Sequence, residues 1–376
     1  MNRLKKIVAT GATALTLVAL SGCATQLPKY AGEFEGKSGL LHEEFVFTDV
    51  PFPQCHASTL EETKKGLVVA WFGGTHEKHA DVGIWVAHQT AHGWTHPIEV
   101  ANGIQHTDKR YPCWNPVLFQ PKKGPLLLFY KAGPSPREWW GMLMTSDDCG
   151  RTWSEPRRLP EDILGPIKNK PIQLANGDIL CGSSTEHVDN GWMAHFEITS
   201  DLGKTWRRIG PVNTQAEFNA IQPAFIQLTD GRIKALCRTQ EDVVSEVSSS
   251  DGGIVWSLMG GSSLPNPNAG FDTVTLDNDT HVIIYNHTTR ATGGRGRLNI
   301  SVSGDGANWL AALELEREKA EFSYPAIIQT SDGMLHATYT WKRQRIKHVV
   351  IDPAKLNPAP MNNGDWPDQR KLWSFQ

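Results

Sequence analysis

The chain has 376 residues, with 37 basic and 40 acidic side chains and a formal net charge of −3. Apolar residues make up 39% and charged residues 20%, which is typical of a globular protein rather than a disordered one. The balanced charge argues against a nucleic-acid-binding protein, which usually carries a basic excess. The 34 Gly and 23 Pro argue against a helical bundle, and the 14 Trp suggest a repeated motif that uses this residue.

The N-terminal segment is typical of an export signal. Arg3, Lys5 and Lys6 precede an apolar stretch over residues 7–20, which is too short to span a bilayer comfortably. Residues 20–23, Leu-Ser-Gly-Cys, match the bacterial lipobox, in which the cysteine is acylated. We therefore expect a lipoprotein signal peptide at 1–22, lipidation at Cys23, and a tether at 23–40. Ala24 favours anchoring at the outer membrane, so that the exported protein contacts the membrane through its lipid alone.

Five further cysteines follow, and none has the spacing of metal ligands, so we expect no metal and no cofactor. In one interpretation, these cysteines are small buried residues of β-strands. Cys55 and Cys113 fall at equivalent places in neighbouring repeats, which leaves a disulfide between them as the alternative.

An internal repeat of about 50 residues organises most of the chain. The pattern Ser-x-Asp-x-Gly-x-Thr-Trp stands at residues 146–153, and variants of it follow at 199–206, 249–256 and 303–309. With Trp94 as a worn fifth copy, the Trp positions are 94, 153, 206, 256 and 309. The motif suits a hairpin turn: Asp accepts hydrogen bonds from turn N–H groups, Gly supplies a positive φ, and Trp packs between sheets.

Between these Asp boxes lie pairs of apolar runs joined by short polar turns. The six turns stand at residues 64–66, 122–124, 176–178, 230–232, 277–279 and 332–334. With two outer strands for each hairpin, the pattern predicts an all-β six-bladed β-propeller over residues 41–352. The last blade lacks an outer strand, and residues 43–47 are the candidate to supply it and close the ring. We expect residues 353–376 to form a strap across the propeller.

Asp boxes on a six-bladed propeller resemble the sialidase superfamily, in its branch of BNR-repeat, exo-α-sialidase-like proteins. The resemblance covers residues 40–352 and implies an exo-acting glycoside hydrolase that removes a terminal anionic sugar from glycans. Such an enzyme needs three Arg for the substrate carboxylate, a nucleophilic Tyr, a Glu that takes the Tyr proton, and an acid Asp. Tyr324 resembles the nucleophile, Arg238 the second clamp residue and Asp81 the acid. Arg297 resembles the third clamp residue, with Arg295 as the alternative.

Propeller topology places the starts of first strands and the ends of second strands around one funnel. The candidate residues there are His56, Asp81, Arg110, Trp114, Asn115, Lys168, Lys170, Glu186, Gln222, Arg238, Asp272, His287, Arg297, Tyr324, Lys342 and Arg343. We expect this funnel to bind a glycan that ends in a carboxylated sugar.

Two positions depart from the family pattern. Where the family has its first clamp Arg, this chain has Cys55-His56-Ala57, and where it has the Glu, this chain has Gln222. Gln cannot act as a base, so Glu186, Glu217 or Asp272 would have to replace it. These departures leave open a uronate lyase with a Tyr or one of His56, His187 and His287 as base, a glycosidase for a non-sialic sugar, and a non-catalytic glycan-binding lipoprotein.

Overall fold

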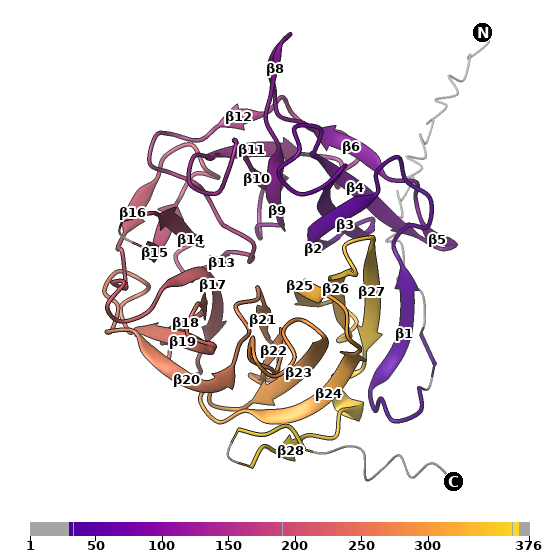
Figure 1. The fold of residues 1–376 in the computed structure, drawn as a ribbon, viewed down its shortest axis with the longest axis vertical. Coiled ribbons are helices and arrows are strands. Elements are labelled where there is room, and N and C mark those ends of the chain that lie inside the picture. The colour runs from indigo at the N-terminus through magenta and orange to yellow at the C-terminus, as the bar shows by residue number, and fades with distance from the viewer. Residues whose placement is uncertain (1–29, 33, 190, 363, 368–376) are drawn as a thin grey trace, which may run out of the picture.

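The computed structural model describes residues 30–32, 34–189, 191–362 and 364–367. Six antiparallel sheets are arranged in a ring around a central axis, and the strand that opens the hairpin of each blade lies closest to that axis (Figure 1). The prediction of an all-β six-bladed propeller is therefore confirmed. Residues 1–29, including the signal segment and Cys23, lie outside the described residues. In the part of the chain that is described, no helix is long and apolar enough to cross a membrane.

The strands follow the predicted hairpins. Blade one comprises β2 (Gln54–Thr63), β3 (Gly66–Gly74), β4 (Gly83–Thr90), β5 (Gly93–Trp94) and β6 (Ile98–Ala101). A small ribbon, β7 (Ile104–His106) with β8 (Lys109–Arg110), precedes blade two, which comprises β9 (Cys113–Phe119), β10 (Leu126–Ala132), β11 (Trp140–Ser146) and β12 (Arg157–Arg158). Blade three comprises β13 (Ile172–Gln173), β14 (Ile179–His187), β15 (Gly191–Thr199) and β16 (Arg207–Ile209).

The second half of the ring repeats this order. Blade four comprises β17 (Ala220–Gln227), β18 (Ile233–Thr239), β19 (Val243–Ser249) and β20 (Gly260–Pro265). Blade five comprises β21 (Asp272–Thr275), β22 (His281–Tyr285), β23 (Arg297–Ser303) and β24 (Leu310–Arg317), and blade six comprises β25 (Phe322–Gln329), β26 (Leu335–Trp341) and β27 (Arg345–Ile351). A short 3-10 helix, Pro353–Lys355, and β28 (Ala359–Pro360) follow.

The ring closes through its ends. β1 (Leu40–Phe45) pairs antiparallel with β27, with Leu40 opposite Ile351 and Phe45 opposite Lys347, so the expected outer strand of blade six is confirmed. After the last blade the chain returns along the edge of blade five, where β28 pairs with β24. Apolar side chains between adjacent blades form the core, as in the cluster that joins β23, β24, β26 and β27.

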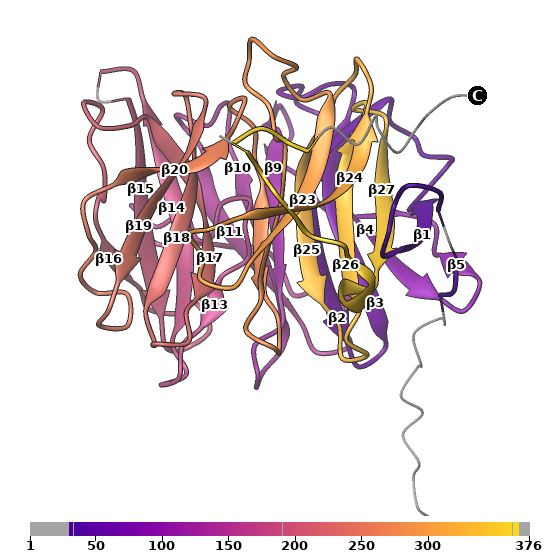
Figure 2. The ribbon, with the colours of Figure 1, turned by 90° about the horizontal axis from the view of Figure 1, so that it is seen from below.

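The two ends of the blades differ. The Asp-box turns and the turns between first and second strands lie on one face of the ring, which we call the Asp-box face. The starts of the first strands and the ends of the second strands lie on the other, which we call the funnel face (Figure 2). Cys55, Cys113, Cys149, Cys181 and Cys237 are all unpaired, so the considered bridge between the first two is not formed.

Candidate functional site

Each blade presents one non-glycine residue with a left-handed backbone where its inner segment begins. These residues are Ala57 (φ 55°), Asn115 (40°), Lys168 (68°), Gln222 (56°), Asn268 (56°) and Tyr324 (49°). In four blades the strand pairing shifts its register beside this residue, as in a β-bulge. Because left-handed φ is strained for such residues and bulges redirect side chains, the six-fold feature marks a constrained ring at the funnel.

Tyr324 stands at the centre of the most connected part of this ring and is 9% exposed. Arg238 donates a hydrogen bond from Nη1 to its hydroxyl oxygen at 2.6 Å, and Gln222 donates from Nε2 at 3.3 Å. Trp192 covers Arg238 from the other side, with the guanidinium carbon 5.2 Å from its ring. Asn268 accepts from Arg238 Nε at 2.7 Å. Arg238 is therefore fixed against the phenol oxygen from several directions.

Further cations surround this tyrosine. Arg295 lies with its guanidinium carbon 5.6 Å from the Tyr324 ring and donates to Glu321 at 3.0 Å. Glu321 also accepts from Arg343 Nε at 2.9 Å, and Arg343 Nη1 reaches Glu77 at 2.7 Å. Burial opposes ionisation of Glu321, but Arg343 and Ser323 hold the pKa of its carboxyl below the usual value. This carboxylate therefore orients two guanidinium groups at the rim of the site.

His56 occupies the position where the family pattern has an arginine. Its ring lies 4.1 Å from that of Tyr324, centroid to centroid, and its Nδ1 is 2.9 Å from the Thr340 hydroxyl. Burial, then the charges of Arg343, Arg295 and Arg238, lower the pKa of His56 well below its usual value. The imidazole is therefore neutral at neutral pH. The carbonyl of Arg343 accepts from the Cys55 N–H at 2.8 Å, which brings this arginine beside the altered segment.

The two candidate acids have opposite electrostatics. Asp81 sits in an exposed loop, where Thr75 donates to both of its carboxylate oxygens at 2.9 and 2.5 Å. Slight burial opposes the effect, but these bonds lower the pKa of Asp81. Burial raises the pKa of Glu186, although Arg238 and Arg137 counteract it. Arg110 donates to the Asp81 carbonyl at 2.7 Å and so holds the loop rather than the funnel.

Several expected binding residues instead link the blades across the axis. The Lys168 amino group donates to Asn169 at 2.9 Å, to the Phe271 carbonyl at 2.6 Å and to the Pro325 carbonyl. These three bonds use all three N–H groups of a lysine, so Lys168 has none left for a substrate. Lys170 pairs with Asp272 at 3.0 Å, and Asp272 also accepts from the Ile327 N–H at 3.0 Å. Blade three therefore bonds to the inner segments of blades five and six.

Other expected residues lie away from Tyr324. Arg297 pairs with Glu314 at 3.0 Å, so the structure places Arg295 beside the tyrosine and Arg297 elsewhere. Arg297 is the first residue of β23, whereas Arg295 lies in the turn before it, so the period of a strand does not place the two side chains on one face. The remaining residues have these partners: His287 bonds Gly364, Lys342 bonds Glu318, Trp114 bonds the Gly133 carbonyl, and Glu217 bonds Thr214. Asn115 is buried in the left-handed ring.

Sequence reasoning missed Glu321, Trp192 and Glu77. Trp192 lies opposite Glu186 on the extended hairpin of β14 and β15, which carries both toward the funnel. One available signal was the dipeptide that ends in Pro at residues 115–116, 222–223 and 324–325, since each begins with a left-handed residue. Glu321 had no such signal, because its two arginine partners come from separate loops.

Known proteins share this architecture. A model of the family described as "BNR repeat-like domain" matches residues 65–337. The anhydrosialidase of Macrobdella decora is 24% identical over 238 residues, which is 54% of this chain and 30% of that protein. The chain thus spans about a third of the length of this curated relative.

Solved structures agree on the fold. A protein of unknown function from Dyadobacter fermentans has a TM-score of 0.69 at 16% identity, over 85% of this chain and 100% of its own. The NanB sialidase from Streptococcus pneumoniae gives 0.67 at 11% identity, over 84% and 71%. The intramolecular trans-sialidase from Ruminococcus gnavus gives 0.63 at 14% identity, over 81% and 96%. With Asp boxes and six blades on this pattern, the chain belongs to the BNR repeat-like family and is a sialidase-like propeller.

Proposed function

We propose that the protein is an exo-acting glycosidase that removes a terminal carboxylated sugar from glycans. The observation that carries this proposal is the Tyr324 hydroxyl held 2.6 Å from Arg238 on the funnel face, with Arg295 beside the ring. A neutral phenol approaches an anomeric carbon next to a carboxylate without the repulsion that a carboxylate nucleophile would meet. The two guanidinium groups supply charge-assisted bonds for that carboxylate.

Proton transfer at this site needs a different distribution of roles from the family pattern. Gln222 contacts the Tyr324 hydroxyl but cannot accept its proton. We assign the base role to His56, which is neutral and packs against the same ring. Glu186 is better suited than Asp81 to donate a proton to the leaving group, because its raised pKa keeps the acid form available at higher pH.

The test is release of sugar from a fluorogenic panel of α-sialosides, uronides and neutral glycosides between pH 4 and 8. Tyr324→Phe should lower kcat/KM at least about 10³-fold, because it removes the attacking oxygen but keeps the ring. Gln222→Glu should raise sialoside hydrolysis about 10- to 100-fold by restoring a carboxylate base. Ser331→Ala, on the Asp-box face, is the matched control and should match the parent. Absence of hydrolysis across the whole panel contradicts the proposal.

A uronate lyase is the second candidate. It is favoured by Gln222, which stands where the family pattern has a Glu. Gln222 and Arg238 both donate to the Tyr324 hydroxyl oxygen, and the neutral ring of His56 packs against the same tyrosine. Such an arrangement suits abstraction of the C5 proton with cations stabilising the enolate. A uronate polysaccharide would then yield an unsaturated product that absorbs in the ultraviolet, and His56→Ala would abolish it. Binding on a glycan array without any product indicates a binding protein instead.

We also propose that the protein is exported and held at the outer membrane by a lipid on Cys23. The support is the lipobox at residues 20–23. Labelled palmitate should enter the wild-type chain but not Cys23→Ser, and labelling of both or neither contradicts the anchor.

A further inference from the structure

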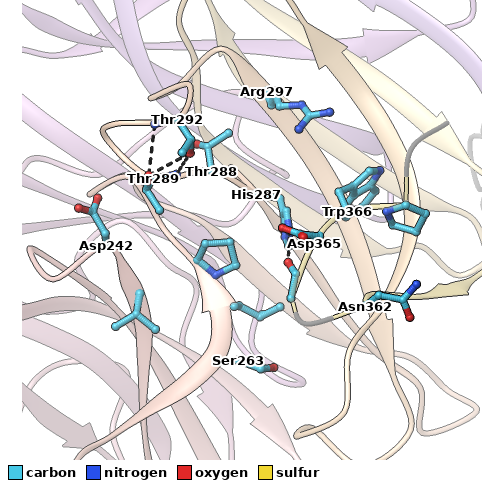
Figure 3. Close-up of a pocket in the computed structure, with 15 residues that line it drawn as sticks. Asp242, Ser263, His287, Thr288, Thr289, Thr292, Arg297, Asn362, Asp365 and Trp366 are labelled. Carbon is cyan, nitrogen blue, oxygen red and sulfur yellow. Dashed lines mark hydrogen bonds between the residues drawn. The ribbon is translucent and has the colours of Figure 1, made fainter. Parts of the chain in front are cut away.

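A cavity of about 900 Å³, distinct from the site around Tyr324, is lined in part by the loop that carries Arg295. Its walls come from residues 242–243 and 263–265 of blade four, from 287–289, 292 and 297 of blade five, and from residues 362 and 364–367 of the returning segment (Figure 3). Arg295 contacts Tyr324, whereas Thr288 and Arg297 line this cavity. One loop therefore separates it from the site around Tyr324.

The returning segment is fixed as a wall of the cavity. β28 pairs with β24, and His287 donates from Nε2 to the Gly364 carbonyl at 2.8 Å. The Tyr285 hydroxyl lies 2.5 Å from His287 Nδ1, and the Trp366 ring lies 5.1 Å from the imidazole. Burial lowers the pKa of His287 to about 4, so the ring stays neutral and keeps its N–H on Nε2. The cavity is therefore formed before any ligand enters.

Two exposed polar side chains of the returning segment are free to bind a ligand. Among the described residues, the Asp365 carboxylate and the Asn362 amide make no hydrogen bond, and both residues are exposed. The indole N–H of Trp366 is likewise without a partner within the resolved segments. Arg297 also lines the cavity (Figure 3); its Nε pairs with Glu314, which leaves the Nη groups as the donors it can offer a ligand. The cavity thus combines hydrogen-bond acceptors, donors and an aromatic ring.

We propose that this cavity is an accessory carbohydrate site that binds one further sugar residue of the glycan acted on at Tyr324. The identity of that glycan rests on the proposed function. A sugar presents both donating and accepting hydroxyl groups, which match Asp365, Asn362 and Arg297. Phosphate groups are disfavoured by the carboxylate of Asp365, since that of Asp242 is already paired with Arg290, and an acyl chain would leave Asp365 without a polar partner.

The experiment is an array of sialylated, uronate-containing and neutral oligosaccharides, probed with the whole chain carrying Arg238→Ala. This substitution removes the main cation of the Tyr324 site, and Arg295→Ala serves as a second version if the first unfolds early. Asp365→Ala and Asn362→Ala are added in turn to this background. Asn278→Ala, an exposed residue on the Asp-box face, is the matched control. Thermal unfolding verifies that each variant is folded.

Array binding should survive Arg238→Ala, fall at least about tenfold with Asp365→Ala or Asn362→Ala, and stay unchanged with Asn278→Ala. Loss of all binding with Arg238→Ala overturns the accessory site, as does full binding without Asp365 and Asn362, or an array with no hits. Hydrolysis by the parent chain is measured separately on the small fluorogenic substrates. A failure there therefore counts against the proposed function and leaves the array result to judge this site.

Discussion

The Asp-box face and the funnel face are built from the same blades by opposite means. On the Asp-box face, one local arrangement repeats: Asp148, Asp201, Asp251 and Asp305 each accept backbone N–H bonds from residues two to four positions later. On the funnel face, the left-handed residue repeats but is of five different types in the six blades, and bonds at this face join distant segments, as between Arg238 and Tyr324. The repeat thus fixes the scaffold, and departures from it make the site.

The largest expected effect on stability comes from removing the hydrogen bonds that link blade three to blades five and six. Lys168→Met removes the donor to two buried carbonyls, those of Phe271 and Pro325, and should lower the free energy of unfolding by about 2–5 kcal/mol. Denaturant unfolding followed by Trp fluorescence measures it. Lys342→Met, which removes a surface partner of Glu318, is the control and should change stability by less than about 0.5 kcal/mol. Unchanged stability with lost glycan binding would return Lys168 to its expected role in the substrate site.

Acid should weaken the funnel face before the Asp-box face. His287 has a folded pKa of about 4 against 6.5 for the free side chain, so its contribution is complete above pH 6.5 and is lost as the pH falls toward 4. His287→Gln should remove up to about 3 kcal/mol of this pH dependence. Thermal unfolding at pH 7.5, 5.5 and 4 measures it. An unaltered pH profile contradicts the assignment of a neutral, buried His287.

The smallest effect is expected on the Asp-box face. The Thr205 N–H and hydroxyl, with the Thr199 hydroxyl, hold the pKa of Asp201 at about 2 against slight burial. Asp201→Ala leaves those turn donors to water and should lower stability by about 1–2 kcal/mol, as for other side-chain caps. Glycan cleavage measured at 25 °C should not change. A fall in kcat/KM at full folding would show that the two faces are coupled.

The sequence was informative about one face and ambiguous about the other, for a physical reason. Asp boxes and hairpin turns are local, so the blades and the closing strand near Glu43 could be predicted from neighbouring residues alone. The direction of a side chain near the axis depends on bulges and on partners far along the chain. Arg295 and Arg297 differ by two positions, yet one contacts Tyr324 and the other pairs with Glu314. Lys168 is of a residue type that suits an anionic substrate, but its amino group donates to backbone carbonyls instead.

The position of Gln222 is a point on which the sequence and the structure agree. Its position opening blade four predicted a neighbour of the tyrosine, and its Nε2 lies 3.3 Å from the Tyr324 hydroxyl. What the chain order does not reveal is that His56 packs on the same ring, because the contact spans blades six and one. The catalytic roles of both residues stay predictions that the substitutions above will decide.

The pairing of β1 with β27 also constrains how the chain is made. Leu40 leaves the ribosome long before its partner Ile351, so the last blade remains an open three-stranded sheet until nearly the whole chain is synthesised. In that interval the free edge of β27 and the unpaired β1 segment are both exposed to other chains. Folding must therefore keep these two strands apart from foreign edges until they meet, and a late truncation within β27 would leave every molecule in the unclosed state.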